Sequence, residues 1–296
     1  MPSVDVTTYT DPACPYAFSA EPIRWRLRWR YGDELRCHLR LVGLSKDGAS
    51  YERMGFTPER AAAALRHFDA YGQPLTTAES RPVGGTWPAC EAIVAVRERR
   101  GIDAAVTLLR ALHVETLAGG AALSDDATLA AALEAGGLDA TADDVAGWRA
   151  EEDVQAAFRA DLSAARRPSP AAVALDQKLA PSGEDWTAEQ AGEPLGPRRY
   201  TCPSYVLERD GRVLEAPGFH TALTIETLVA NLAPELEQRP WATDPLEVVR
   251  WAGEPLTTQE VAAVLDREGE RDAVGEELAA AGATRRPIGT DALWTA

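Results

Sequence analysis

A cysteine, Cys14, opens the segment Cys14-Pro15-Tyr16-Ala17, which stands between a strand pattern and a helix pattern. A cysteine at the start of a helix meets unpaired backbone N–H groups and the positive end of the helix dipole, and both favour the thiolate over the thiol. The thiolate is the form of sulfur that attacks disulfides and electrophiles. The segment therefore predicts a nucleophilic thiol at Cys14.

The elements that would hold Cys14 follow from the spacing of apolar residues. Residues 4–9 alternate apolar and polar side chains, as a half-buried strand does. Asp11-Pro12 interrupts this strand, and residues 18–31 then carry apolar side chains at helical spacing. The pattern predicts a strand, a tight turn and a helix, with Cys14 in the turn.

A second segment that could do chemistry lies far along the chain, where Cys202 is followed directly by Pro203. Two short strand patterns come next, at residues 205–208 and 213–216. Asp210-Gly211 joins them and is a strong signal for a tight β-hairpin. We therefore expect Cys202 and Pro203 to sit at the start of a hairpin.

This chain resembles the DsbA-like branch of the thioredoxin superfamily in two segments: the Cys14-Pro15 turn between a strand and a helix, and the Cys202-Pro203 pair before a hairpin. That branch includes FrnE-like oxidoreductases and the kappa-class glutathione transferases. The resemblance implies an α/β, thioredoxin-like fold with an inserted all-helical domain, here followed by a C-terminal helical extension. The domains it implies are a thioredoxin-like domain (1–45 and 195–234), a helical insertion and connection (46–194) and an acidic helical extension (235–296).

The same resemblance implies catalytic roles for Cys14, Cys202 and Pro203. The family places a cis-proline opposite its active-site cysteine, and Pro203 is the matching position. Redox members carry a second cysteine three positions after the first, where this chain has Ala17. The usual step, in which that second thiol expels a bound partner, is therefore missing. Cys202, which the family's geometry turns toward the nucleophile, is expected to take this step or to share a metal ion with Cys14.

Five residues are expected to contact substrate. Tyr16 and Pro15 belong to the active turn, where the Tyr16 hydroxyl would donate to a bound thiol or, alternatively, only pack on the helix. Arg199 would hold a carboxylate of a small thiol, or else remain a solvated charge. Cys90 follows Trp87-Pro88 in a first helical turn, where the helix dipole would lower its pKa. The complete set is Pro15, Tyr16, Cys90, Arg199 and Thr201.

Composition excludes several classes of protein. The net charge of −16 disfavours nonspecific binding to nucleic acid or to an anionic membrane. Residues 235–296 carry 13 acidic and 6 basic side chains, which argues against a DNA-reading tail. Four scattered cysteines, one of them Cys37 in an expected buried strand, do not form a disulfide framework. We expect a cytoplasmic protein with no membrane segment, because neither a signal peptide nor a long apolar run is present.

The expected activity is that of a thiol-dependent oxidoreductase. Cys14 would attack a disulfide or an electrophile, and either Cys202 or a low-molecular-weight thiol, glutathione or mycothiol, would resolve the product. No tightly bound cofactor is expected, and the four histidines lack the spacing of metal ligands. The sequence leaves the oligomeric state open, with a homodimer as one of the alternatives. Two alternatives remain: a glutathione- or mycothiol-dependent transferase or isomerase, and a thioredoxin-fold protein that binds metal or an iron–sulfur cluster through Cys14 and Cys202.

Overall fold

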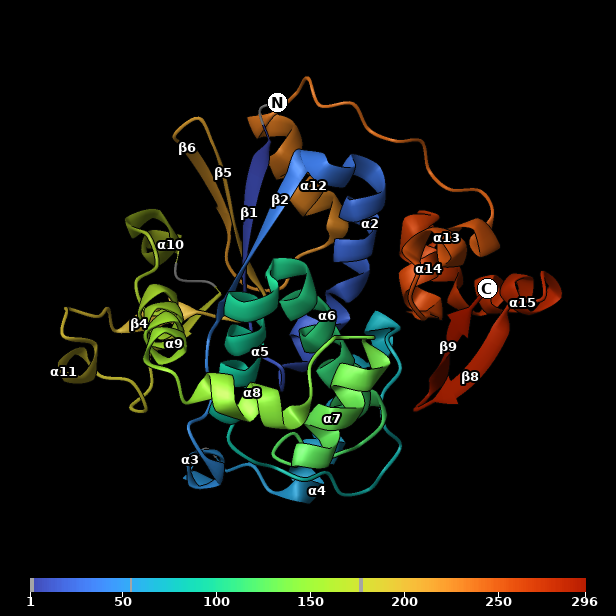
Figure 1. The fold of residues 1–296 in the computed structure, drawn as a ribbon. Helices are drawn as coiled ribbons and strands as arrows, with labels where there is room; N and C mark the ends of the chain where they lie inside the picture. The colour runs from blue at the N-terminus through green and yellow to red at the C-terminus, as the bar shows by residue number, and fades with distance from the viewer. Residues whose placement is uncertain (1–2, 54, 176–177) are drawn as a thin grey trace.

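The computed structural model describes residues 3–53, 55–175 and 178–296 and has a four-stranded mixed sheet at its centre (Figure 1). The strand order is β2-β1-β5-β6, with β1 parallel to β2 and antiparallel to β5. The strands are β1 (Val4–Thr10), β2 (Leu35–Leu41), β5 (Ser204–Arg209) and β6 (Arg212–Ala216).

One face of this sheet packs on α2 (Glu21–Tyr31) and α12 (Ala222–Leu232). Val4, Val6 and Leu207 lie in that core, because alternate side chains of a strand point to the same face. Asp210 and Gly211 both have positive φ, as the two-residue turn between β5 and β6 requires. The hairpin predicted from the sequence is confirmed.

The segment between the two halves of the sheet is mainly helical and has its own apolar core. The sequence pattern predicts one helix from 143 to about 162, but the structure has two there, because the chain turns at Ala150 and Glu151 is extended. The helices are α3 (Gly48–Arg53), α4 (Pro58–Leu65), α5 (Trp87–Arg100), α6 (Ile102–His113), α7 (Asp126–Ala135), α8 (Ala142–Arg149), α9 (Glu152–Ala165) and α10 (Pro170–Leu175). A 3-10 helix (Arg66–Tyr71) follows α4, and a π-helical turn (Val114–Ala118) follows α6.

The connection back to the sheet contains a short helix and a small hairpin. The sequence predicts a helix that begins at Thr187 with Gln190 at the capping-box position, and the two residues form this capping box at the start of α11 (Ala188–Ala191). Strand β3 (Leu179–Pro181) pairs with β4 (Arg198–Tyr200), which leads directly into Cys202. The five prolines of residues 166–197 predict an irregular connection, but the structure has a short helix and a paired strand there.

We call residues 235–296 the C-terminal module. The sequence predicts three short helices here, over 245–251, 261–266 and 273–281, and the structure contains three helices and also a three-stranded sheet. The sheet corrects the purely helical description of this extension. Its hairpin was not anticipated, because Arg285, Arg286 and Pro287 interrupt the apolar alternation that marks a strand. The elements are α13 (Pro245–Ala252), β7 (Leu256–Thr257), α14 (Thr258–Val264), α15 (Arg271–Ala280), β8 (Thr284–Ile288) and β9 (Asp291–Thr295).

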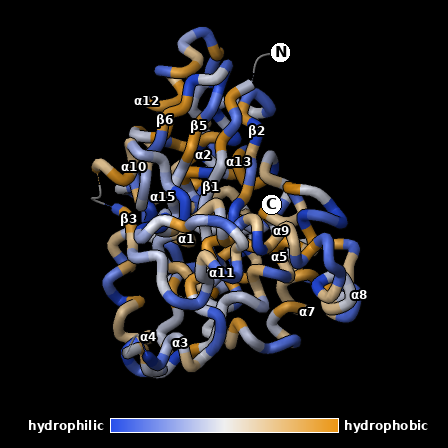
Figure 2. The backbone as a smooth tube through the Cα atoms, turned by 90° about the vertical axis from the view of Figure 1, so that its left-hand side faces the viewer, coloured by the Kyte–Doolittle hydropathy of each residue, from blue (hydrophilic) through white to orange (hydrophobic). Residues whose placement is uncertain are grey.

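The C-terminal module packs against α2, beside the sheet (Figure 1). Trp25 and Trp29 of α2 are buried in one core with apolar residues of α13, α14 and β9. Figure 2 shows apolar and polar stretches interleaved along most elements, the pattern of elements that bury one face. Among the described residues, every helix is too short or too polar to cross a lipid bilayer.

Candidate active site

Cys14 is the N-cap residue of α1 (Pro15–Ser19), with Pro15 as the first helical residue. The Cys14 backbone N–H donates to the Asp11 carbonyl at 3.1 Å, which closes the turn after β1. The helical run expected over 18–31 breaks at Ala20, where α1 ends and α2 begins. The predicted arrangement of strand, turn and helix around Cys14 is confirmed.

The structure brings Cys202 and Pro203 to Cys14. Strands β1 and β5 pair so that Tyr9 lies opposite Ser204, and this register places the residues before β5 beside the active turn. The Cys14 thiol donates to the Cys202 carbonyl at 3.1 Å, and the peptide bond between Cys202 and Pro203 is cis, as the resemblance implies. Two cysteines 188 positions apart are therefore in contact.

The two thiols also interact directly. A hydrogen bond to Cys14 and burial raise the pKa of Cys202 well above its ordinary value, and the Arg199 guanidinium acts in the opposite direction. Cys202 therefore keeps its proton at neutral pH. Both cysteines are free thiols in buried residues, each 6% exposed.

Tyr16 is the most exposed of the residues expected to bind substrate. Its ring is 43% exposed and contacts the rings of Phe68 and Phe219, which come from the helical insertion and from the segment after β6. An aromatic surface therefore borders the active turn. Pro15 is partly buried beneath Tyr16 in the same turn.

Arg199 and Thr201 lie on the chain that leads into Cys202. Arg199 is partly buried, donates to the Tyr200 carbonyl at 2.9 Å and acts electrostatically on the Cys202 thiol. The Thr201 hydroxyl donates to the Lys178 carbonyl at 2.6 Å, which ties this chain to the connection. These contacts place both residues next to the thiol pair.

Cys90 lies in the protein interior, away from any surface that a substrate could reach. It is completely buried, and burial together with the nearby Asp11 carboxylate raises the pKa of its thiol instead of lowering it. A fully buried thiol cannot touch substrate in this conformation, so the predicted role of Cys90 in substrate binding is wrong. Cys37, expected to be buried, is exposed on β2.

Asp11 is a residue of the site that sequence reasoning missed. Its carboxylate is fully buried and accepts hydrogen bonds from the Ala13 and Leu44 backbone N–H groups, at 2.9 and 2.8 Å, and from the Thr86 hydroxyl at 2.9 Å. The Cys90 thiol lies 3.5 Å from the same carboxylate. Asp11 thus joins the active turn to α5, and its own pKa is raised by burial.

Arg81 and Tyr51 are two further residues that the sequence did not single out. The Arg81 side chain is 9% exposed, and its guanidinium forms no hydrogen bond or ion pair within the described chain. Burial raises the pKa of Tyr51, and the neighbouring Asp11, Cys14 and Cys202 raise it further, whereas Arg81 lowers it. Arg81 is thus a buried cation without a counter-ion in the described chain, and both it and the thiol pair act electrostatically on Tyr51.

No protein-family model matches the sequence, and no curated protein is similar enough to count as a relative. Solved structures are similar in fold. The cytosolic disulfide reductase DsbM from Pseudomonas aeruginosa aligns with a TM-score of 0.50 and 16% identity over 77% of this chain and 99% of its own. A probable DsbA oxidoreductase from Streptomyces coelicolor aligns with a TM-score of 0.52 and 19% identity, over 81% of this chain and 93% of its own.

A third structure, of a Nitrosomonas europaea protein assigned to the protein disulfide isomerases, aligns with a TM-score of 0.55 and 15% identity, over 79% of this chain and 98% of its own. The fold is that of the DsbA-like proteins. About a fifth of the chain has no counterpart in that structure, and the C-terminal module makes up the same share. Within the described residues, no group of three or more histidine, cysteine or carboxylate side chains could hold a metal ion.

Proposed function

We propose that this DsbA-like protein catalyses thiol–disulfide exchange with Cys14 as the nucleophile and Cys202 as the resolving thiol. The observation that carries the proposal is the contact between the two cysteines, in which the Cys14 thiol donates to the Cys202 carbonyl at 3.1 Å. Both thiols are free, and the interaction with Cys14 raises the pKa of Cys202. Cys202 thus supplies the second sulfur that Ala17 cannot provide.

The reaction has two displacements. The Cys14 thiolate attacks one sulfur of a substrate disulfide, forms a mixed disulfide and releases the other sulfur as a thiolate, which takes up a proton. Cys202 then loses its proton, attacks the Cys14 sulfur and expels the second substrate thiolate. The substrate disulfide is reduced to two thiols, and Cys14 and Cys202 are oxidised to a disulfide. The same steps in reverse would oxidise a dithiol.

A small external thiol is the alternative resolving group. It would attack the mixed disulfide in place of Cys202 and leave Cys14 reduced. Arg81 favours a small substrate with a carboxylate, because a buried guanidinium without a partner is stabilised by an incoming anion. Glutathione carries carboxylates and mycothiol carries none, so the site favours glutathione.

We place the protein in the cytoplasm, where such thiols are abundant.

Oxidation tests the pair directly. After mild oxidation, peptide mapping is expected to find one intramolecular disulfide, between Cys14 and Cys202. In the Cys202→Ala variant, the Cys14 mixed disulfide can no longer be resolved internally, so it should accumulate and be seen as a mass adduct. Rapid turnover of Cys202→Ala with no external thiol, or a Cys14 disulfide to another cysteine, would contradict the proposal.

Arg81→Gln tests the substrate class. We expect kcat/KM for oxidised glutathione to fall about 10- to 100-fold, because a charge-assisted hydrogen bond contributes about 1.5–3 kcal/mol. The value for uncharged bis(2-hydroxyethyl) disulfide should change less than about threefold. Arg60→Gln is the matched control, since Arg60 is an exposed arginine on α4. If kcat/KM fell equally for both disulfides, Arg81 would not recognise a substrate carboxylate and this part of the proposal would be wrong.

A further inference from the structure

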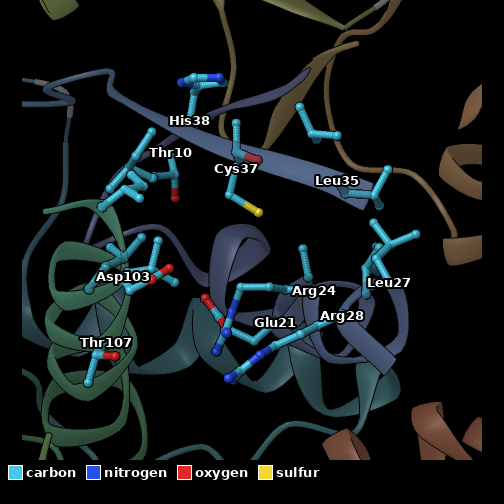
Figure 3. Close-up of a pocket in the computed structure, with 18 of the residues that line it drawn as sticks. Thr10, Glu21, Arg24, Leu27, Arg28, Leu35, Cys37, His38, Asp103 and Thr107 are labelled. Carbon is cyan, nitrogen blue, oxygen red and sulfur yellow. The ribbon is translucent and has the colours of Figure 1, made fainter. Parts of the chain in front are cut away.

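A cleft of about 520 Å³ lies between α2, α6 and the sheet, and neither Cys14 nor Cys202 lines it. Figure 3 shows it with the strand that carries Cys37 above, α6 on one side and α2 on the other. Apolar side chains such as Leu27, Leu39 and Leu109 form much of its lining. The volume and the mixed lining are those of a site for a small organic molecule.

The α2 wall of the cleft carries two guanidinium groups, of which that of Arg28 is exposed and that of Arg24 has one unpaired but buried donor. The Nε atom of Arg24 donates to Glu21 at 2.8 Å, but its Nη2 atom is buried and makes no hydrogen bond. Arg28 forms no ion pair with any described residue and instead lies over the rings of Trp25 and Trp251, at 5.2 and 5.5 Å. In Figure 3 both guanidinium groups extend into the cleft. This wall can accept a carboxylate.

The opposite wall carries a negative charge. Asp103, in the first turn of α6, is exposed and pairs with no cation of the described chain. Asp103, Arg24 and Arg28 line the same cleft as Cys37. Although Cys37 is exposed to solvent, the side chains around it desolvate its thiol and raise its pKa, Asp103 raises the pKa further, and Arg24 and Arg28 lower it. Cys37, whose sulfur points into the cleft in Figure 3, therefore lies within the field of both walls.

The lining as a whole is not suited to a simple anion. Besides the two arginines it includes four carboxylates, at Glu21, Asp33, Asp103 and Glu254. Glu21 pairs with Arg24, and Glu254 with Arg110 of α6. A ligand with one negative group would meet attraction on one wall and repulsion on the other, whereas a ligand with both charges is attracted by both.

We propose that this cleft is a binding site for a small amino-acid-like zwitterion, a free apolar amino acid or an apolar dipeptide. Its carboxylate binds Arg24 and Arg28, its ammonium group binds Asp103, and its apolar side chain packs on Leu27, Leu39 and Leu109. Neither cysteine of the thiol pair lines the cleft, although Ala17 and Pro203 do, and binding there does not depend on the proposed exchange reaction.

Calorimetric titration with leucine, phenylalanine and leucyl-leucine tests the site, with N-acetyl-leucine and leucinamide as ligands that lack one charge each. We expect binding only of the zwitterions. At ten times its Kd, a ligand should slow alkylation of Cys37 by a maleimide about tenfold, since about nine-tenths of the sites are filled. Peptide mapping reports Cys37 separately from the other cysteines.

Arg28→Gln and Asp103→Asn should each weaken binding at least about tenfold, since each removes one charged partner. Arg36→Gln is the matched control, because Arg36 is adjacent to Cys37 on β2 but outside the cleft lining. The proposal is overturned if no zwitterion binds, or if N-acetyl-leucine and leucinamide bind as well as leucine does. Binding that leaves Cys37 alkylation unchanged would place the ligand elsewhere and also overturn it.

Discussion

Replacing Cys14 by serine is expected to lower the rate of thiol–disulfide exchange at least about 1000-fold, the scale of effect seen when a nucleophile is removed from an enzyme. A hydroxyl stays protonated at neutral pH and cannot form the mixed disulfide. The serine hydroxyl can still donate to the Cys202 carbonyl, so the fold should be kept. Reduction of oxidised glutathione, followed by the release of its thiol, measures the loss.

The matched control is Cys37→Ser, which exchanges sulfur for oxygen at the exposed cysteine. Cys37 lies opposite Val6 in the sheet, four residues before the end of β1, so its sulfur is not part of the thiol pair. We expect this variant to keep at least about half of the exchange rate. If Cys14→Ser retained comparable activity, another group would have to be the nucleophile and the proposed mechanism would be wrong.

Glu260→Ala is expected to destabilise the protein by about 3–5 kcal/mol, because it leaves the buried Arg110 guanidinium with only the longer contact to the partly exposed Glu254 carboxylate, at 3.4 Å. Glu260 is completely buried and binds Arg110 of α6 through two hydrogen bonds, at 2.9 and 2.6 Å. It also accepts from the Thr257 backbone N–H at 2.8 Å as the capping box of α14. One carboxylate thus joins the helical insertion to the C-terminal module and begins a helix.

Urea unfolding followed by tryptophan fluorescence measures this effect, because Trp25, Trp29 and Trp294 lie in the core of the C-terminal module. Glu247→Ala is the control. Glu247 is half exposed and pairs with Arg239 on the surface of the same module, so its loss should cost less than about 1 kcal/mol. If both variants lowered the free energy of unfolding equally, the buried pair would contribute no more to stability than the surface pair. Replacing Arg110 and Glu260 together by leucine should recover much of the loss.

The local elements around Cys14 could be predicted because they depend on neighbours in sequence. The alternation in residues 4–9, the Pro15 helix start and the Asp210-Gly211 turn each act over a few residues, and each has the expected structure. The Thr187 capping box followed the same local logic. The contact between Cys14 and Cys202 required the resemblance, since nothing local specifies it.

The errors concern long-range packing. Cys90 occupies a helix start that should lower a thiol pKa, but the helix is buried against Asp11 and desolvation dominates. Asp11 had appeared only as the residue that ends a strand, and its four donors come from three separate segments. Arg81 and Tyr51 carry no motif, so only the folded chain reveals that Tyr51 lies within the electrostatic field of both the thiol pair and Arg81.

The position of the C-terminal module has a consequence for how this fold stays dispersed in water. Trp25 and Trp29 belong to α2, yet their burial depends on side chains from after residue 241. Without that cover, this helix would present a contiguous aromatic patch, of the kind that promotes self-association. A chain of the same fold that lacks the module must therefore carry polar side chains on this helix, or hide it behind another subunit.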